Sequence, residues 1–340
     1  MRPAGHGQLP TVRPSLGVTV SVAGRNLRIE ATSEYALAAI MPAVAHLAVS
    51  PPIGGRHIRW TIVEENDAWR PHAFGSTGAY RIRGGGFAVV QNDPPSLESY
   101  RPDLGIELRA GRDALAAGDF RAHPGSYALA AWLGGPRTQV LHAGAVAYDG
   151  AAALIVGGSG FGKSTTVLAC AMAGAGFLGD DLVLVEADGG NDSATPTVHC
   201  LFATAKLNND SALALGANSW PVLGVTPKHK AVFAVQPRLK VMRSAPIVAM
   251  IVLAPPITGH PEPQRLKPAE ILASLGSTAA PVVCRTSPPA MWLASVAALA
   301  RRLPAYRLPV SWAFEALEPA VRAIITQAAG LKGTERRNAS

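Results

Sequence analysis

Residues 157–165 read Gly157-Gly158-Ser159-Gly160-Phe161-Gly162-Lys163-Ser164-Thr165 and match the phosphate-binding loop pattern G-x-x-x-x-G-K-[ST]. Glycines let the backbone approach phosphate groups without a Cβ in the way. The loop amides and the positive end of the following helix attract the anion. The pattern predicts that the ammonium of Lys163 reaches the β- and γ-phosphates of ATP or GTP and that the hydroxyl of Ser164 binds Mg²⁺. The candidate nucleotide-binding residues are Gly158, Ser159, Gly160, Phe161, Gly162, Lys163, Ser164 and Thr165.

The segments that flank this loop have the order strand, loop, helix that a nucleotide-binding loop requires. Residues 151–156 form a short apolar run that predicts a buried strand. Residues 165–173 are largely apolar and contain good helix formers, and Gly174 and Gly176 are candidates for ending that helix. An accidental glycine-rich turn is the alternative, and the flanking strand and helix argue against it.

Two adjacent carboxylates follow the predicted helix. Asp180 and Asp181 precede an apolar run at residues 182–185, and Asp181 lies 18 positions after Lys163. Beside a phosphate, one carboxylate can help to hold Mg²⁺, usually through water, and the other can accept the proton of an attacking hydroxyl. A solvated turn before a strand is the alternative interpretation, because Asp favours turns.

A histidine lies upstream of the loop at a spacing that suits the same site. His142 stands 21 positions before Lys163. The segment Tyr148-Asp149-Gly150 predicts a hairpin turn between the strand of His142 and the strand at residues 151–156. This hairpin would bring His142 near the γ-phosphate as a hydrogen-bond donor or a local cation. A purely structural histidine is the alternative that the sequence leaves open.

Taken together, His142, the loop ending at Ser164 and the segment from Gly176 to Asp181 resemble the HPr kinase/phosphorylase family and its kinase-like relatives. The resemblance is strong over residues 141–186 and weaker to about residue 325. It implies an α/β fold with a phosphate-loop kinase core of the HPr kinase and PEP carboxykinase type. It also implies transfer of the γ-phosphoryl group of ATP, with Mg²⁺, to a serine or threonine hydroxyl.

The same resemblance implies a role for each candidate catalytic residue. Asp181 would be the proton acceptor, Lys163 the phosphate-binding lysine and His142 the active-site histidine of the family. Ser164 and Asp180 would hold the Mg²⁺ ion.

The chain departs from the family pattern in two places. Residues 197–206 lack a Glu-containing, Gly-Arg-rich motif, so the magnesium-binding Glu of the family has no clear counterpart and the reverse phosphorolysis is in doubt. A later catalytic Arg is not obvious either. Lys230 could take that place, although Lys lacks the planar fork of Arg, and a solvated loop lysine is the favoured alternative.

The phosphate acceptor is a matter of resemblance, not of any residue in this chain. A peptide or small protein is expected, and a homo-oligomer stays open. The best guess is the C-terminal serine of a lasso-peptide precursor, with HPr as the other acceptor. A nucleotide-binding regulator without phosphotransfer is an alternative of a different class, and a small-molecule kinase or a PEP-carboxykinase-like activity is a third.

Composition sets limits on the remaining possibilities. The formal net charge is +8, but the basic residues are dispersed and form no long run with interleaved aromatics, so nucleic acid is an unexpected partner. The three cysteines lie far apart without metal-ligand spacing, which suits a reducing compartment. The longest apolar stretch, around residues 246–253, is too short to cross a bilayer, and we expect a cytoplasmic protein.

Length and local patterns predict two domains with short terminal segments. Strands are expected at residues 18–22, 27–30, 59–63, 87–90 and 246–253, and helices at 33–41, 127–133, 290–302 and within 314–329. Pro42 is expected to end or kink the first helix. The predicted parts are a flexible leader (1–15), a smaller β-rich α+β domain of unknown role (16–136), the kinase core (137–330) and a flexible tail (331–340).

Overall fold

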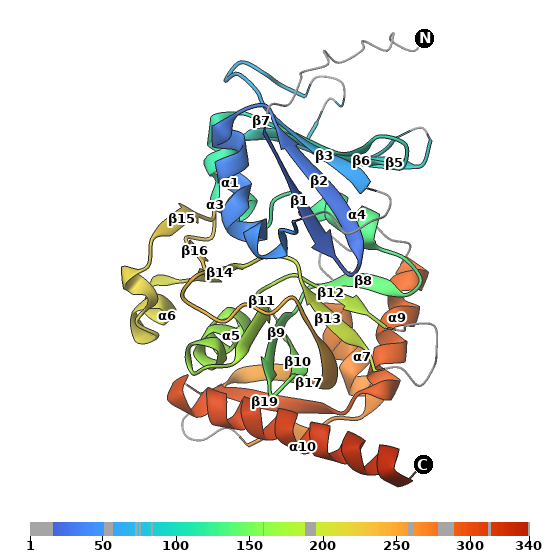
Figure 1. Ribbon diagram of the computed structural model, residues 1–340. Coiled ribbons are helices and arrows are strands. Elements are labelled where there is room, and N and C mark those ends of the chain that lie inside the picture. Colours follow the sequence, from blue (N-terminus) through green and yellow to red (C-terminus); the bar gives the residue numbers. More distant parts are fainter. Residues whose placement is uncertain are drawn as a thin grey trace.

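The computed structural model describes residues 16–50, 57–71, 74, 76–82, 84–158, 160–187, 195–257, 262–277, 289–311 and 314–338. These residues form a mixed α/β fold with three β-sheets. A seven-stranded sheet lies at one end of the molecule, and a nine-stranded sheet with its helices lies at the other (Figure 1). The predicted flexible leader falls outside the described residues.

The N-terminal sheet combines hairpins with two parallel strand pairs. Its strand order is β1-β2-β3-β7-β6-β5-β4, in which β2–β3 and β3–β7 are the parallel pairs. The strands predicted at residues 18–22 and 27–30 are confirmed, because they fall within β1 and β2, which pair antiparallel around Ala23 and Gly24. The strands are β1 (Leu16–Val22), β2 (Arg25–Ala31), β3 (His57–Glu64), β4 (Gly78–Ile82), β5 (Gly86–Asn92), β6 (Pro95–Arg101) and β7 (Gly105–Ala110).

Short helices connect and cover this sheet. They are α1 (Glu34–Val44), η1 (Ala45–Leu47), α2 (Arg112–Ala116), α3 (Gly118–Ala122) and α4 (Ser126–Leu133). Of the two effects expected of Pro42, the end of the first helix is wrong, because α1 continues to Val44, and the kink stays a prediction. Pro42 removes one backbone hydrogen bond, but its neighbours Ala39, Ile40 and Ala43 are buried, and this packing holds the last turn.

The nine-stranded sheet carries the phosphate-binding loop. Its strands follow the path β11-β9-β10-β17-β13-β12-β8, and β19 joins it beside β17 and β18. β10 lies parallel to β17, and β17 lies parallel to β19. The strands are β8 (Thr138–Leu141), β9 (Gly144–Tyr148), β10 (Ala151–Val156), β11 (Gly176–Gly179), β12 (Val183–Glu186), β13 (Thr197–Cys200), β17 (Ser244–Ile257), β18 (Gln264–Arg265) and β19 (Ala305–Ser311).

Strand β10 is buried on both faces, as its continuous apolar run predicts. Ile155 packs in the hydrophobic cluster that contains residues of α5 (Lys163–Met172) and α10 (Leu317–Asn338). Leu154 and Val156 pack in the cluster that contains residues of α7 (Pro268–Ser277) and α9 (Pro289–Arg302). Successive side chains of a strand point to opposite faces, so helices cover this sheet on both sides.

A small third sheet lies beside α5 and α3. It has the order β14-β16-β15 and consists of β14 (Thr204–Leu207), β15 (Val222–Val225) and β16 (Ala231–Ala234). Helix α6 (Asn209–Ala214) follows β14 directly, and η3 (Ala217–Ser219) comes next. Figure 1 shows this sheet and α6 projecting at the side of the molecule, between the two larger sheets.

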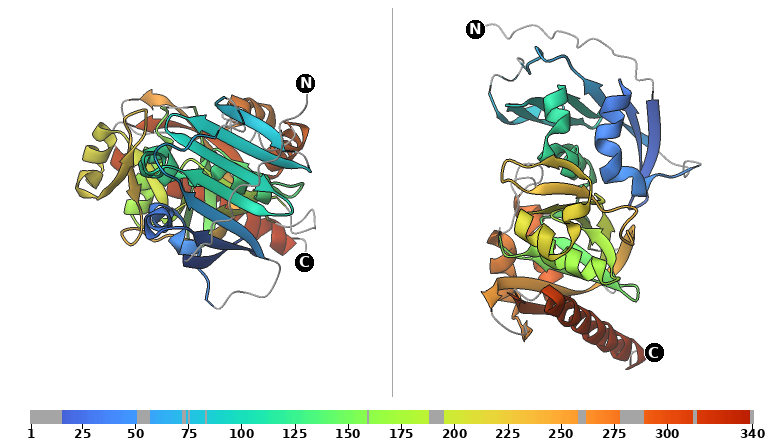
Figure 2. Two further views of the ribbon diagram at one scale, coloured as in Figure 1. Left: turned by 90° about the horizontal axis from the view of Figure 1, so that it is seen from above. Right: turned by 90° about the vertical axis from the view of Figure 1, so that its left-hand side faces the viewer.

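Helix α10 crosses the end of the molecule that is farthest from the N-terminal sheet (Figure 2, right). A short helix, η4 (Phe314–Ala316), precedes it. Helix α10 continues through residues 331–338, past the helix region predicted within 314–329, and the flexibility of the tail stays a prediction. Gly330 costs about 1 kcal/mol of helix propensity, but the residues that follow include Leu, Lys, Glu and Arg, which are good helix formers.

The two predicted domains share part of a core. The predicted boundary near residues 134–136 lies between α4 and β8, where the chain passes from one large sheet to the other. The cluster under the N-terminal sheet also contains Leu184 of β12 and Phe202, so the division into domains stays a prediction. Within the described ranges, no helix has the length and apolar character that a membrane span needs.

Candidate functional site

The phosphate-binding loop joins β10 to α5 as the sequence predicts. Gly160 has φ +86° and Gly162 has φ +80°, conformations that glycine adopts without a Cβ penalty. A Cβ on Gly162 would also lie 3.3 Å from the side chain of Val310. Helix α5 then begins at Lys163, two residues earlier than predicted. Ser159 lies outside the described residues.

Lys163 is turned back onto its own loop. Its Nζ donates to the carbonyl oxygens of Gly157 (2.9 Å) and Gly158 (3.4 Å). Burial lowers the pKa of Lys163, although the charges of Asp181 and Asp180 oppose this effect. An anion bound in the loop offers this buried ammonium a stronger partner than the two neutral carbonyl groups.

The acidic pair forms a tight turn between β11 and β12. The N–H of Leu182 donates to the carbonyl oxygen of Asp180 at 2.9 Å, and the residue between them, Asp181, has φ +75°. This hydrogen bond with a positive central φ defines a γ-turn of the rare, strained kind. Strain of this sort is concentrated at functional sites, where the surrounding structure holds it in place.

The carboxylate of Asp181 lies between two donors from other segments. His142, between β8 and β9, donates from Nε2 to Oδ1 at 2.5 Å, and Lys206 of β14 donates from Nζ to Oδ2 at 2.5 Å. Burial raises the pKa of Asp181, but the hydrogen bond from His142 and the charge of Lys206 outweigh it and hold the pKa well below its usual range. The same carboxylate raises the pKa of Lys206 against the opposing effect of burial.

Asp180 points into the protein and is almost fully buried, with 1% of its surface exposed. Its Oδ2 accepts the backbone N–H of Lys206 at 3.0 Å. Burial and the negative charge of Asp181 raise its pKa, while Lys206 and the nearby hydroxyl of Ser164 oppose the rise. Its Oδ1 is buried and accepts no hydrogen bond from the described residues.

The residues Ser164 and Asp180 fit a Mg²⁺ ion. The unsatisfied carboxylate oxygen of Asp180, near the Ser164 hydroxyl, offers the hard oxygen donors that this ion prefers. The described residues contain no group of three or more His, Cys, Asp and Glu side chains suited to a metal. Phosphate oxygens and water would complete the coordination, as is usual for Mg²⁺.

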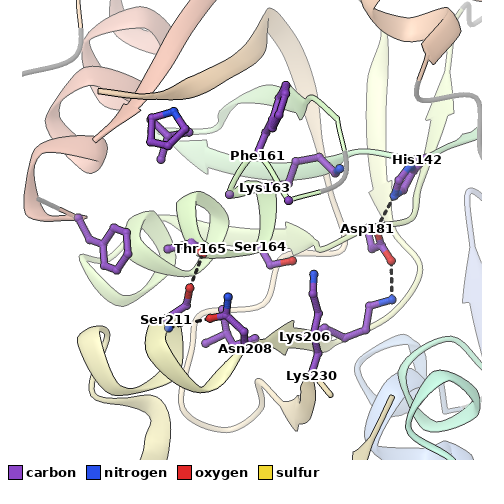
Figure 3. Close-up of a pocket in the computed structure, with 16 residues that line it drawn as sticks. His142, Phe161, Lys163, Ser164, Thr165, Asp181, Lys206, Asn208, Ser211 and Lys230 are labelled. Atoms are coloured by element: carbon purple, nitrogen blue, oxygen red, sulfur yellow. Dashed lines mark hydrogen bonds and ion pairs between the residues drawn. The ribbon is translucent and has the colours of Figure 1, made fainter. Parts of the chain in front are cut away.

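These side chains gather around one cavity of about 220 Å³. Figure 3 shows Asp181 between His142 and Lys206, beside the N-terminus of α5, and Phe161 projecting from the loop. Thr165 donates from Oγ1 to the Oγ of Ser211 in α6 at 3.1 Å, which joins α5 to the helix that follows β14. The lining residues are His142, Gly160, Phe161, Gly162, Lys163, Ser164, Thr165, Asp181, Lys206, Leu207, Asn208, Ser211, Lys230, Pro256, Val310 and Phe314.

The structure therefore brings most of the predicted site residues together. His142, Lys163, Ser164 and Asp181 line the cavity, and Asp180 lies behind it. Gly158 lies at the back of the loop and accepts from Lys163.

Three contributions were missed or misjudged from the sequence. Lys230 lines the cavity and is half-buried, whereas a solvated loop lysine was the favoured interpretation. Lys206 and His123 were missed. Lys206 is the sole Lys or Arg between Lys163 and Lys228 in the sequence, but this isolation does not indicate whether it faces water or a carboxylate. His123 carries no signal either, since it reaches Asp180 from 57 positions away.

Comparisons with known proteins add little to this geometry. No protein-family model and no curated protein matches the chain. Among solved structures, the HPr(Ser) kinase/phosphatase from Coxiella burnetii is similar, with 13% identity and a TM-score of 0.33. The similarity covers 58% of this chain and 97% of that chain. A TM-score this low carries no argument about fold or function, so the site must be interpreted from its own residues.

Proposed function

We propose that the protein is an ATP-dependent kinase that transfers a γ-phosphoryl group to a serine or threonine hydroxyl of a peptide or small protein. We also propose that residues 137–330 form a phosphate-loop kinase core of the HPr kinase and PEP carboxykinase type. One observation carries the proposal: the phosphate-binding loop and the Asp180–Asp181 turn, with His142 on Asp181, meet at one cavity.

The cavity has the charge that a polyanion requires. Lys163, Lys206 and Lys230 line it, and Asp181 is the single carboxylate among its described lining residues. Loop amides and the start of α5 add partial positive charge where phosphates would lie. A nucleotide would draw the ammonium of Lys163 from the carbonyl oxygens of Gly157 and Gly158 to its β- and γ-phosphates.

In the proposed reaction, the acceptor oxygen forms a bond to the γ-phosphorus while the bond to the bridging β–γ oxygen breaks and ADP leaves. A Mg²⁺ ion held by Ser164 and Asp180 would neutralise phosphate charge. Asp181 accepts the hydrogen bond, and finally the proton, of the attacking hydroxyl. His142 orients this carboxylate through Oδ1. Because phosphoryl transfer depends mainly on positioning and charge, a carboxylate of low pKa can serve in this role.

The acceptor is the least constrained part of the proposal. No residue of the cavity favours a lasso-peptide precursor over HPr. Incubation with γ-³²P-labelled ATP, Mg²⁺ and each acceptor in turn decides between them, with Lys163→Ala as the control. Label on the C-terminal serine of a precursor peptide supports the peptide kinase. Label on HPr alone shows that HPr, not the peptide, is the acceptor. Label on neither acceptor, together with a failure to bind nucleotide, overturns the proposal.

A second candidate is a nucleotide-binding regulator without phosphotransfer. The observation that favours it is the low pKa of Asp181, whose two oxygens are both occupied by donors. A regulator would bind Mg·ATP with a stoichiometry of one and leave it intact with every hydroxyl acceptor. Calorimetry combined with analysis of the bound nucleotide after prolonged incubation distinguishes the two candidates.

A further inference from the structure

A segment of the predicted N-terminal domain (residues 16–136) contacts the backbone of the Asp180–Asp181 turn. The short helix α3 ends at Ala122, and His123 follows it as the capping residue. The Nε2 of His123 lies 3.3 Å from the carbonyl oxygen of Asp180. A carbonyl oxygen can only accept a hydrogen bond, so this nitrogen carries the hydrogen and donates it.

That carbonyl oxygen is the one that closes the strained turn. It also accepts the N–H of Leu182 at 2.9 Å, across the positive φ of Asp181. A carbonyl oxygen has two lone pairs, and here both are used. The bond from His123 therefore fixes the peptide group that sets the direction of both carboxylates.

The same N-terminal segment also holds β14, which supplies Lys206. The hydroxyl of Thr204 donates to the carbonyl oxygen of Ala122 at 2.6 Å. The N–H of Lys206 donates to Oδ2 of Asp180 at 3.0 Å. Ala122, His123, β14 and the acidic turn thus form a closed network of hydrogen bonds.

Packing leaves the imidazole little freedom to move. The ring of His123 lies 5.2 Å from the ring of Phe202, measured between centroids. Close contact fixes α3 as well, because a Cβ on Gly118 would lie 2.4 Å from the backbone carbon of Val225. Helix α3 is therefore seated directly against the third sheet.

We propose that His123 is a positioning residue that sets the geometry of the Asp180–Asp181 turn. The predicted N-terminal domain, residues 16–136, is thereby a part of the catalytic unit. The proposal rests on the proposed function for its catalytic consequence, but the positioning itself can be measured without any reaction. It assigns a role to the segment 118–123, for which the sequence offers none.

The test uses the full chain and amide hydrogen exchange in the segments 178–186 and 203–208. His123→Met removes the donor and keeps an apolar side chain of similar size beside Phe202. We expect the amides of Leu182 and Lys206 to exchange roughly tenfold faster, as the loss of one hydrogen bond implies. His123→Gln restores a donor near the position of Nε2 and should return the exchange to within about threefold of the wild type.

A matched control separates positioning from general loosening. His199 of β13 is another partly buried histidine, which pairs with Glu186 at 3.3 Å. His199→Met should leave exchange at the acidic turn unchanged. Unchanged exchange in His123→Met, or equal acceleration in His123→Met and His123→Gln, overturns the proposal, because ring packing would then explain any effect.

Turnover supplies the second measurement. His123→Met should lower kcat roughly tenfold or more with little change in the KM for ATP, and His123→Gln should recover most of it. If the wild type transfers no phosphate but the amides of the turn exchange faster in His123→Met than in the wild type, the positioning is supported and the proposed kinase is refuted. Normal kcat in His123→Met contradicts the catalytic consequence of the positioning.

Discussion

Lys206 places its Nζ 2.5 Å from Oδ2 of Asp181, although the two residues stand 25 positions apart in the chain. Both side chains are largely shielded from water, with 14% and 24% of their surfaces exposed. A charge pair in such a setting is stronger than one on the surface. The pair holds the carboxylate in place and puts a cation at the wall of the proposed phosphate site.

Lys206→Met should weaken both functions of this pair. We expect kcat with ATP to fall roughly tenfold to a hundredfold, because a desolvated charge pair and a phosphate ligand are lost together. Lys228→Met, which removes an exposed lysine of the neighbouring loop, is the control. Steady-state kinetics of the two variants side by side provide the measurement, and equal activities would exclude a role for Lys206.

Lys163→Ala should remove the main phosphate ligand of the loop. The expected loss of transition-state stabilisation is about 3 kcal/mol or more, which is at least a hundredfold in kcat/KM. The melting temperature should change little, because the ammonium forms hydrogen bonds to two loop carbonyl oxygens and has no ion pair with any described residue. Near-normal turnover by this variant would refute the assignment of the loop.

Asp181→Asn should keep the fold and lose the transfer reaction. Asn has the same shape as Asp and, like Asp, adopts a positive φ more readily than most residues, so the turn at φ +75° should survive. The neutral amide cannot take the proton of the acceptor hydroxyl. Calorimetric titration should show retained ATP binding, while the labelled-phosphate assay should show no product. If transfer survives, Asp181 is not the base.

The raised pKa of Glu98 predicts that the free energy of unfolding depends on pH, independently of the candidate nucleotide site. Burial raises the pKa of Glu98 to about 7, although backbone N–H groups of Ala128 and Tyr127 oppose the rise. Between the unfolded value near 4.5 and the folded value, the native state binds one proton more than the unfolded state. The free energy of unfolding therefore falls as the pH rises through this range, by roughly 2–3 kcal/mol.

Urea unfolding at pH 4.5 and pH 7.5 measures this effect in the wild type and in Glu98→Gln. The variant cannot ionise at this position, and its amide oxygen can still accept the N–H of Ala128. The drop in stability between the two pH values should therefore be smaller in the variant by about the stated amount. An equal drop in both proteins would show that Glu98 titrates normally.

Gly118→Ala tests how closely α3 packs against the third sheet. The new methyl group would lie 2.4 Å from the backbone of Val225, so the two segments must separate, at a cost of about 1–3 kcal/mol. Gly111→Ala is the control, because Gly111 lies directly before the short helix α2 and has open space around its Cβ position. Thermal unfolding of both variants should show destabilisation in Gly118→Ala alone.

Local features of this protein could be predicted from its sequence. The strand at Ala151–Val156 has the predicted bounds, and the hairpin turn at Asp149 and Gly150 has the positive φ angles that an Asp-Gly turn adopts. The loop and the acidic pair can be recognised in the sequence because each is a continuous stretch of characteristic residue types. Such features depend on neighbouring residues, whose backbone preferences act in every context.

Tertiary structure alone decided which distant side chains complete the site. His123 reaches Asp180 across 57 positions through the seating of α3. The spacing of His142 predicts its place near the phosphates, but its contact with Asp181, 39 positions away, depends on the order of strands in the sheet. Lys206 was unpredictable in its role, because an isolated lysine at the end of a short strand has the same local pattern whether it faces water or a carboxylate. Its partner is set by the fold, since a charge becomes buried only where another segment supplies the opposite charge.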